Sequence, residues 1–145
     1  MNLVRTEATL TAEGAGFLIQ KSIETAKESG LKISVCVLDS GGRLKSFSSM
    51  DEAPAVSLEA CIKKAKTAIG FGIPTGEQWH QFIKNDPILQ QGVQQLPDFI
   101  LLGGGSPVFF QGRLVGAIGV SGGHYKQDEA CTKAALDAFE QAIRG

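Results

Sequence analysis

The chain has 145 residues and a formal net charge of −1, from 14 basic and 15 acidic side chains. This length suits a single domain, residues 1–145, with one buried core. The lack of a basic surplus argues against a dedicated nucleic-acid-binding protein. A composition of 43% hydrophobic and 20% charged residues argues against wholesale disorder. Glycine is the exception at 18 residues, many of them clustered.

The N-terminal segment MNLVRTEATLTAEG carries Arg5 and Glu7 and has no apolar core of the kind found in secretory signals, so we expect a cytoplasmic protein. No apolar run approaches the roughly 18 residues of a membrane-spanning helix, so we expect no membrane partner. Cys36, Cys61 and Cys131 are odd in number and form no CxxC pair. We interpret them as three buried thiols, with neither a disulfide framework nor a zinc site.

The first half of the chain predicts a helix followed by a hairpin. Apolar residues recur at helical spacing from Thr11 to Ser29, and Gly30 follows as a helix stop. Leu31 to Leu38 is typical of a strand rich in β-branched residues. The turn sequence DSGG, residues 39–42, then leads to a second strand at Leu44 to Ser48.

A second helix is expected to begin at Pro54. Its predicted buried face consists of Leu58, Ile62, Ala65 and Ile69. The lysines between these positions, Lys63, Lys64 and Lys66, are expected to form a solvated edge.

The region after this helix is expected to be less regular. Thr75 and Gln78 resemble a capping box for a short helix through Phe82. The glutamine-rich residues 85–97, bounded by two prolines, predict an irregular connection with one or two helical turns and are the candidate for a mobile lid.

The remaining elements complete the sheet. Residues 99–102 are predicted to form a short strand, and residues 108–110 and 114–120 a second hairpin across Gln111-Gly112. A last helix begins near Gln127 or Asp128. Because hairpins replace a regular βαβ alternation, the expected fold is α+β, with an antiparallel five-stranded sheet flanked by helices.

Two glycine clusters carry candidate sites. The segment GAIGVSGG, residues 116–123, lacks the GxGxxG and GxxxxGK[ST] patterns, which argues against standard nucleotide loops. Its glycines indicate either close packing or contact with a ligand or subunit, and the sequence leaves both open. The turn GGGSP, residues 103–107, is either a simple tight turn or a set of amide groups for a carboxylate.

The two histidines limit the possible imidazole chemistry. His124 lies between a glycine pair and the acidic start of a helix, where its ring could point into a pocket. With Ser121 and Asp128 it has the residue types of a hydrolase triad, but no GxSxG motif supports that interpretation. His80, beside Trp79, is expected to have a surface or packing role. Two histidines and no HExxH motif give little support to a dedicated metal site.

Several ordered motifs together resemble the GlcG/HbpS family, which also includes the C-terminal domain of PduO-type corrinoid adenosyltransferases. They are VLDSGGRL (37–44), MDEAP (50–54), KKAKTAIGFGIPT (63–75), GGSPVFFQGRLVGAIGVSGG (104–123) and QDE (127–129). The resemblance spans nearly the whole chain and implies one profilin-like domain, homo-oligomeric assembly, and binding of haem or a related tetrapyrrole in some members.

Two departures from the family matter for function. Where many members have RMDGA, this chain has Ser49-Met50-Asp51-Glu52-Ala53, so an anion contact from that arginine is not carried over. After SGG, relatives often have a small hydroxyl residue, whereas this chain has His124. That histidine could serve as an axial ligand of haem or could mark a different small molecule.

The expected ligand-binding site combines the end of the first hairpin, the glycine turn and the strand-to-helix corner. Its residues are Met50, Asp51, Gly104, Gly105, Ser121, Gly122, Gly123 and His124. If haem is the ligand, replacement of His124 is expected to matter and replacement of His80 to matter little.

Two classes of function remain open. One is a non-catalytic protein that binds haem or another tetrapyrrole. The alternative is an accessory enzyme or reactivating factor acting on small organic acids or diols in a catabolic pathway.

Overall fold

In the computed structural model, which describes residues 1–145, a four-stranded antiparallel sheet carries helices on both faces. The elements are α1 (Ala12–Glu28), β1 (Ser34–Asp39), β2 (Leu44–Ser49), α2 (Val56–Phe71), α3 (Glu77–Ile83), α4 (Pro87–Gln94), β3 (Gly105–Phe110), β4 (Arg113–Ser121) and α5 (Tyr125–Arg144). The strand order is β2-β1-β4-β3, so the two hairpins lie side by side and β2 and β3 are the edges.

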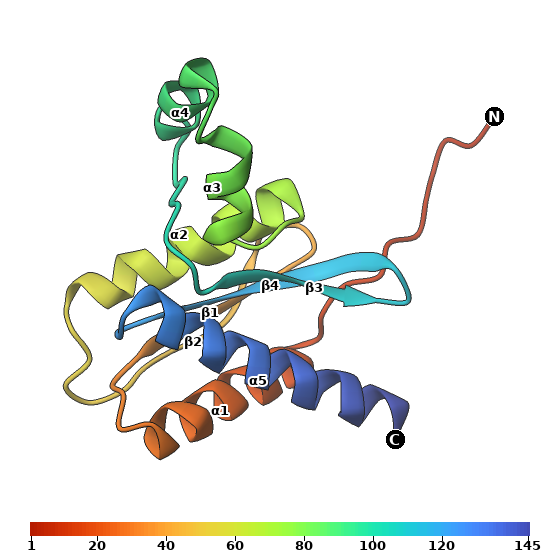
Figure 1. Cartoon of the computed structure of the whole chain (residues 1–145). Coiled ribbons are helices and arrows are strands. Elements are labelled where there is room, and N and C mark those ends of the chain that lie inside the picture. Colours follow the sequence, from red (N-terminus) through yellow and green to blue (C-terminus); the bar gives the residue numbers. More distant parts are fainter.

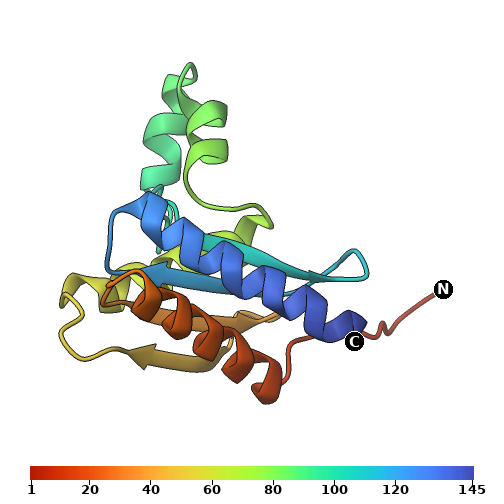
Figure 2. The same cartoon turned by 60° about the horizontal axis from the view of Figure 1, so that its bottom comes forward.

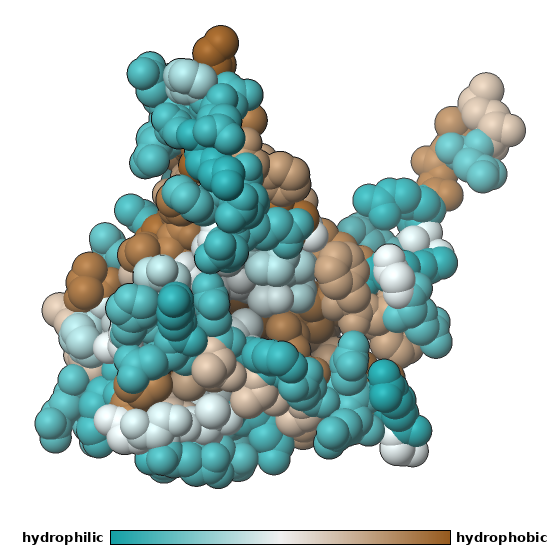
Figure 3. Space-filling view, viewed as in Figure 1, coloured by the Kyte–Doolittle hydropathy of each residue, from teal (hydrophilic) through white to brown (hydrophobic).

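The helices form two unequal layers and a projection. Helices α1 and α5 lie next to each other on one face of the sheet (Figure 2). Helix α2 covers the other face, against β1, β3 and β4, while α3 and α4 stand away from the sheet beyond α2 (Figure 1). The space-filling view shows apolar surface at the outer end of this projection (Figure 3). Ile88 and Leu89 of α4 are both exposed.

The central strand β1 is buried along its whole length because helices cover both of its faces. Val35 and Val37 point into the main core beneath α1 and α5, whereas Cys36 and Leu38 pack toward α2. This alternation follows from the two-residue period of a strand. The all-antiparallel sheet between helical layers confirms the α+β class.

The α3–α4 projection has its own small core. Trp79 and Ile83 of α3 pack with Val93 of α4, and Phe99 lies against them. The Trp79 ring packs edge-on against both Phe71 and Phe99. Residues 85–97 therefore contain a defined helix, in agreement with the expected one or two helical turns.

The expected fifth strand at residues 99–102 is wrong, and the sheet has four strands. The Ile100 amide donates a hydrogen bond to Thr67 Oγ1, 3.0 Å away on α2, and the Thr67 hydroxyl donates to the Asp98 carbonyl. These backbone groups pair with a helix side chain, so the segment crosses α2 instead of extending the sheet. The profilin likeness stays a prediction.

Two local expectations around α2 and α3 are also wrong. Lys64 is 1% exposed, because the buried side of α2 is rotated about one position from the predicted face and leaves Leu58 exposed. Thr75 does not cap α3. The cap is Gly76, without a side-chain hydrogen bond, and Thr75 Oγ1 instead accepts from the Gly105 amide at 2.9 Å.

Other features agree with the sequence or add to it. Helix α1 begins where predicted, with Thr11 accepting a hydrogen bond from the Gly14 amide. All three cysteines are buried, as expected. No helix in the chain combines the length and apolar character needed to cross a membrane.

Candidate functional site

A buried ion pair joins the second and fifth helices across the end of the sheet. Lys64 Nζ of α2 lies 2.9 Å from Asp128 Oδ2 of α5, and both side chains are 1% exposed. Lys64 Nζ also donates to the Val120 carbonyl at 2.9 Å, and Asp128 Oδ1 accepts from the Gly123 amide at 2.9 Å. Since both charges are paired and hydrogen-bonded, the cost of burying them is offset.

The glycine turn beside this pair is held by two threonines. Thr75 accepts from the Gly105 amide, and Thr132 Oγ1 donates to the Gly104 carbonyl at 2.8 Å. A Cβ at Gly104 would lie 2.9 Å from that of Asp128 and 3.0 Å from Lys64 Nζ. Only glycine fits this close approach, particularly at its φ of 121°. The backbone of the turn is therefore held in one conformation. The Gly105 amide already donates its hydrogen bond to Thr75.

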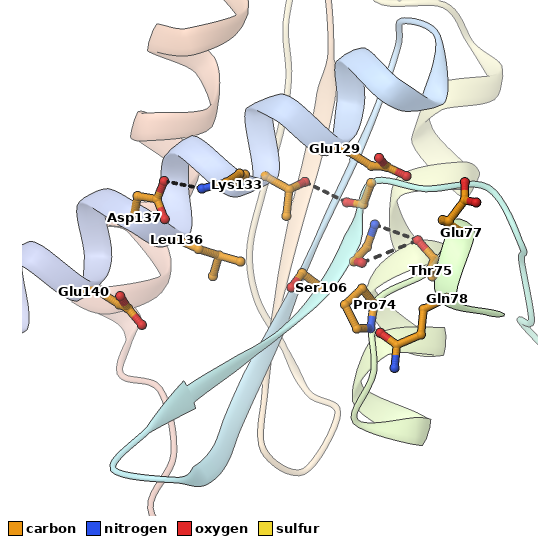
Figure 4. A pocket seen from close by; sticks show the side chains of 13 residues that line it. Pro74, Thr75, Glu77, Gln78, Ser106, Glu129, Lys133, Leu136, Asp137 and Glu140 are labelled. Carbon is orange, nitrogen blue, oxygen red and sulfur yellow. Dashed lines mark hydrogen bonds and ion pairs between the residues drawn. The ribbon is translucent and has the colours of Figure 1, made fainter. Parts of the chain in front are cut away.

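The largest cleft lies on one side of the turn, between α3, β3 and α5 (Figure 4). It has a volume of about 530 Å³ and is lined mainly by polar residues. Its carboxylates are Glu77, Glu129, Asp137 and Glu140, and Lys133, its only basic residue, is ion-paired with Asp137 at 2.9 Å. This charge balance disfavours an anionic ligand.

A second cleft, of about 240 Å³, opens beyond Gly103, between α3 and the start of α5. Its lining combines apolar side chains, aromatic rings and bare backbone: Leu101, Leu102, Tyr125, His80, Glu77, Gly76 and Gly103. His80 is exposed, and its imidazole makes no hydrogen bond within the chain. This is the cleft in the chain that brings an unengaged imidazole next to apolar and aromatic surface.

A third cleft, of about 210 Å³, lies between the first turns of α2 and α5. Ser121, Gly122 and Gly123 line it together with Lys64 and Asp128. It shares Leu102 and Tyr125 with the second cleft, so the two adjoin at the start of α5.

His124 is the N-cap of α5. Its Nδ1 accepts from the Lys126 amide at 3.2 Å, its own amide donates to Gln127 Oε1 at 2.9 Å, and its ring packs on Tyr125 with centroids 4.3 Å apart. An Nδ1 that accepts a hydrogen bond leaves the proton of a neutral imidazole on Nε2. To bind a metal through Nε2, His124 would have to release this cap.

The eight residues expected to form one pocket lie in several places. Ser121, Gly122 and Gly123 share the third cleft, and Gly104 and Gly105 line the largest one on the other side of the glycine turn. Met50 packs against the main core, with its sulfur 3.4 Å from the Ile33 amide, and Asp51 is exposed. His124 caps α5 beside the second and third clefts, through its contact with Tyr125.

Sequence reasoning missed two residues of this region. Lys64, expected on a solvated edge, is buried, whereas His80 is exposed, in agreement with the expected surface role. Tyr125 was not considered, although it follows His124 directly. One feature of the sequence could have indicated Tyr125. Tyr125 and Asp128 lie in the first turn of the last helix, which starts at the same end of the sheet as the glycine turn.

The architecture defines a small α+β domain whose clefts gather where a glycine turn, a strand end and two helix starts meet. The chain belongs to the family described as "Haem degrading protein HbpS-like", whose model matches residues 10–137. This confirms the resemblance found in the sequence.

Known proteins support the assignment. Protein GlcG of Escherichia coli K12 is 30% identical over 118 residues, which cover 81% of this chain and 85% of GlcG. The crystal structure of Klebsiella pneumoniae protein ORFY has a TM-score of 0.84 and 30% identity and covers 97% of both chains. The structure described as the PduOC:Heme complex has a TM-score of 0.77 and 25% identity, covering 90% of this chain and 95% of that one.

Proposed function

We propose that this protein binds haem or a related tetrapyrrole at the 240 Å³ cleft beside Gly103. The observation that carries the proposal is the imidazole of His80, which is free of hydrogen bonds and stands beside Leu101, Leu102 and Tyr125. Imidazole is a common axial ligand of haem iron, and apolar side chains suit the porphyrin ring. The family description and the haem complex of the PduO relative give independent support.

The fit of a tetrapyrrole to this cleft is partial. The volume lies below the roughly 300–1,000 Å³ of pockets that enclose drug-sized ligands, so a ring would rest against the cleft with much of its surface outside it. Gly76 and Gly103 contribute backbone atoms to the lining, but the space that a side chain would take at either glycine is filled by the Glu129 carboxylate. When bound, haem would supply an iron centre. The residues described here would hold and orient it.

Haem carries two propionate groups, and their placement favours this cleft over the largest one. The 530 Å³ cleft has four carboxylates and a single, already paired, lysine. Like charges there would repel propionates. The smaller cleft has one carboxylate, Glu77, and no lysine or arginine, so the propionate edge of a ring there would have to extend into solvent.

Two histidines could supply the axial ligand, and their environments differ. His80 can offer a ring nitrogen without breaking a hydrogen bond. His124, the candidate favoured by the sequence, must first give up its bond from the Lys126 amide. Loss of an N-cap costs about 0.5–2 kcal/mol. We therefore assign the axial position to His80 and keep His124 as the competing candidate.

Hemin titration followed by the Soret band tests the proposal. Wild-type protein should give a saturable shift, His80→Ala should change the band and weaken binding, and His124→Ala should keep the wild-type spectrum. The opposite pattern would transfer the ligand role to His124 and overturn the assignment to His80. No saturable shift with wild-type protein would overturn the tetrapyrrole proposal itself.

We also propose that a second copy of the chain covers the β2 edge of the sheet. Strand β2 has no neighbour on one side, and α2 does not extend over it, so Leu44 and Phe47 are exposed. The other edge, β3, contains Pro107, which disfavours addition of a strand. A homo-oligomer would bury the apolar side chains of β2 and satisfy its free edge.

The alternative of an accessory enzyme for small organic acids or diols stays a prediction, as does the cytoplasmic location. Neither follows from the fold.

A further inference from the structure

The 210 Å³ cleft between the starts of α2 and α5 contains a hydroxyl group that has no hydrogen-bond partner within the chain. Ser121 is 8% exposed, and its Oγ makes no hydrogen bond within the chain. Ser121 pairs with Ser34 in the sheet, so both side chains point to the same face. Ser34 Oγ contacts Ser57 Oγ on α2 at 2.8 Å. The Ser121 hydroxyl is therefore directed toward the α2 side, where the cleft lies.

Two donor groups around the cleft have unused hydrogen-bond capacity. Lys64 Nζ has three N–H groups, of which the chain uses two, for Val120 and Asp128. Helix α2 starts at Val56 without a side-chain cap, and the Val56 amide donates to no backbone or side-chain group. Val56 lines the cleft.

Two side-chain acceptors of the same cleft, those of Asp128 and Ser57, already have partners. Asp128 accepts from Lys64 and from the Gly123 amide, one bond at each carboxylate oxygen. Ser57 Oγ donates to the Pro54 carbonyl at 2.6 Å and contacts Ser34. The Lys64–Asp128 pair carries no net charge, so the field that remains is that of two helix N-termini, which favours negative charge.

From these free donors we infer that the cleft binds a small oxyanion, a carboxylate or a phosphate, through the Ser121 hydroxyl and the start of α2. Its volume of about 210 Å³ is below that of pockets that enclose drug-sized ligands, which suits a ligand of a few heavy atoms. The inference concerns a different cleft from the tetrapyrrole proposal and does not depend on it.

The test is a titration of uniformly ¹⁵N-labelled full-length protein with sodium acetate and, separately, sodium phosphate, at constant ionic strength set with chloride. We expect saturable shifts of the Val56, Gly122 and Gly123 amide signals. Acetamide, which has the shape of acetate without its charge, should leave them unchanged. The anion that binds more tightly identifies the source of the oxyanion.

Two variants control the titration. Ser121→Ala should weaken anion binding about tenfold or more, as expected for loss of a hydrogen bond to a charged group. Ser48→Ala, a change of the same kind on β2 facing away from α2, should leave the affinity unchanged. Equal melting temperatures of both variants and wild type would show that the fold is kept.

Absence of saturation with both anions would overturn the inference. It would also fail if acetamide or chloride caused the same shifts, or if Ser121→Ala bound as tightly as wild type. Hemin binding can succeed or fail without affecting any of these outcomes, because the titrations contain no tetrapyrrole.

Discussion

The ammonium group of Lys64 and the carboxylate of Asp128 lie 2.9 Å apart in the interior, although the two residues are 64 positions apart in the chain. Their bond connects the helix on one face of the sheet with the helix that starts at its end. Lys64 also bonds the Val120 carbonyl near the end of β4, and Asp128 bonds the Gly123 amide in the corner that leads into α5. The pair therefore holds both segments in place. All three clefts lie around this corner.

Removal of either charge should destabilise the domain strongly. We expect Lys64→Met or Asp128→Asn to lower the free energy of unfolding by about 3–5 kcal/mol, since each leaves the other buried group uncompensated. Urea denaturation measures this. Lys63→Met, on the exposed neighbouring position, should change stability by less than about 0.5 kcal/mol. A small effect of both buried substitutions would show that the pair is not desolvated as described.

The pair also shows which parts of the fold could be predicted. The hairpins were found because their signals are local: the DSGG turn and Gln111-Gly112 lie directly between alternating segments. Lys64 was missed because a lysine in an amphipathic helix is normally placed in water. Its burial depends on a partner on α5, and no local pattern contains that information.

The site was only partly predictable for the same reason. Ser121, Gly122 and Gly123 share a cleft because they are consecutive at one strand end. Their separation from Gly104 and Gly105 results from the Lys64–Asp128 contact, which comes between the two groups. The false strand at residues 99–102 has a similar origin, since Thr67 on α2 takes the hydrogen bonds that a neighbouring strand would have taken.

Gly119 should not tolerate a side chain. A Cβ there would overlap the Cys61 carbonyl oxygen and lie 2.7 Å from the Ala65 nitrogen, so α2 could not keep its close approach to β4. We expect Gly119→Ala to destabilise the domain by about 1–3 kcal/mol. Gly16→Ala on the exposed side of α1 meets nothing within 4 Å and should stabilise by about 0.5–1 kcal/mol. Thermal and urea unfolding measure the change in the free energy of unfolding for each variant. Equal changes in the two variants would contradict the close packing of α2 on β4.

The buried thiols should be inert in the folded protein. Burial raises the pKa of Cys36 and of Cys61 to about 12, and that of Cys131 to about 11. The reactive thiolate is therefore scarce at pH 8. Ellman's reagent should react slowly with native protein and rapidly with all three thiols after unfolding in guanidinium. Fast reaction of native protein would show that these residues are accessible.

The same pKa values predict a loss of stability in alkali. A raised folded-state pKa means that the folded protein holds its thiol protons more tightly than the unfolded chain does. The resulting contribution is complete below the ordinary pKa of 9.0 and is lost as pH rises from there toward about 12. The free energy of unfolding should fall across this range, and a Cys36→Ala variant should show a shallower fall. A slope that does not change in the variant would contradict this origin.

The exposed edge of β2 predicts how copies of the chain associate. Light scattering coupled to size exclusion at micromolar concentration should give a mass above that of one 15.3 kDa chain. Phe47→Lys should shift the mass toward the monomer, because it places a charge on the apolar surface beside the free strand edge. Phe82→Lys changes a more exposed ring on α3, away from the sheet, and should leave the mass unchanged. A monomeric mass for wild type at all concentrations would rule out the homo-oligomer. An oligomer that survives Phe47→Lys but dissociates with Phe82→Lys would move the interface from β2 to the α3–α4 projection.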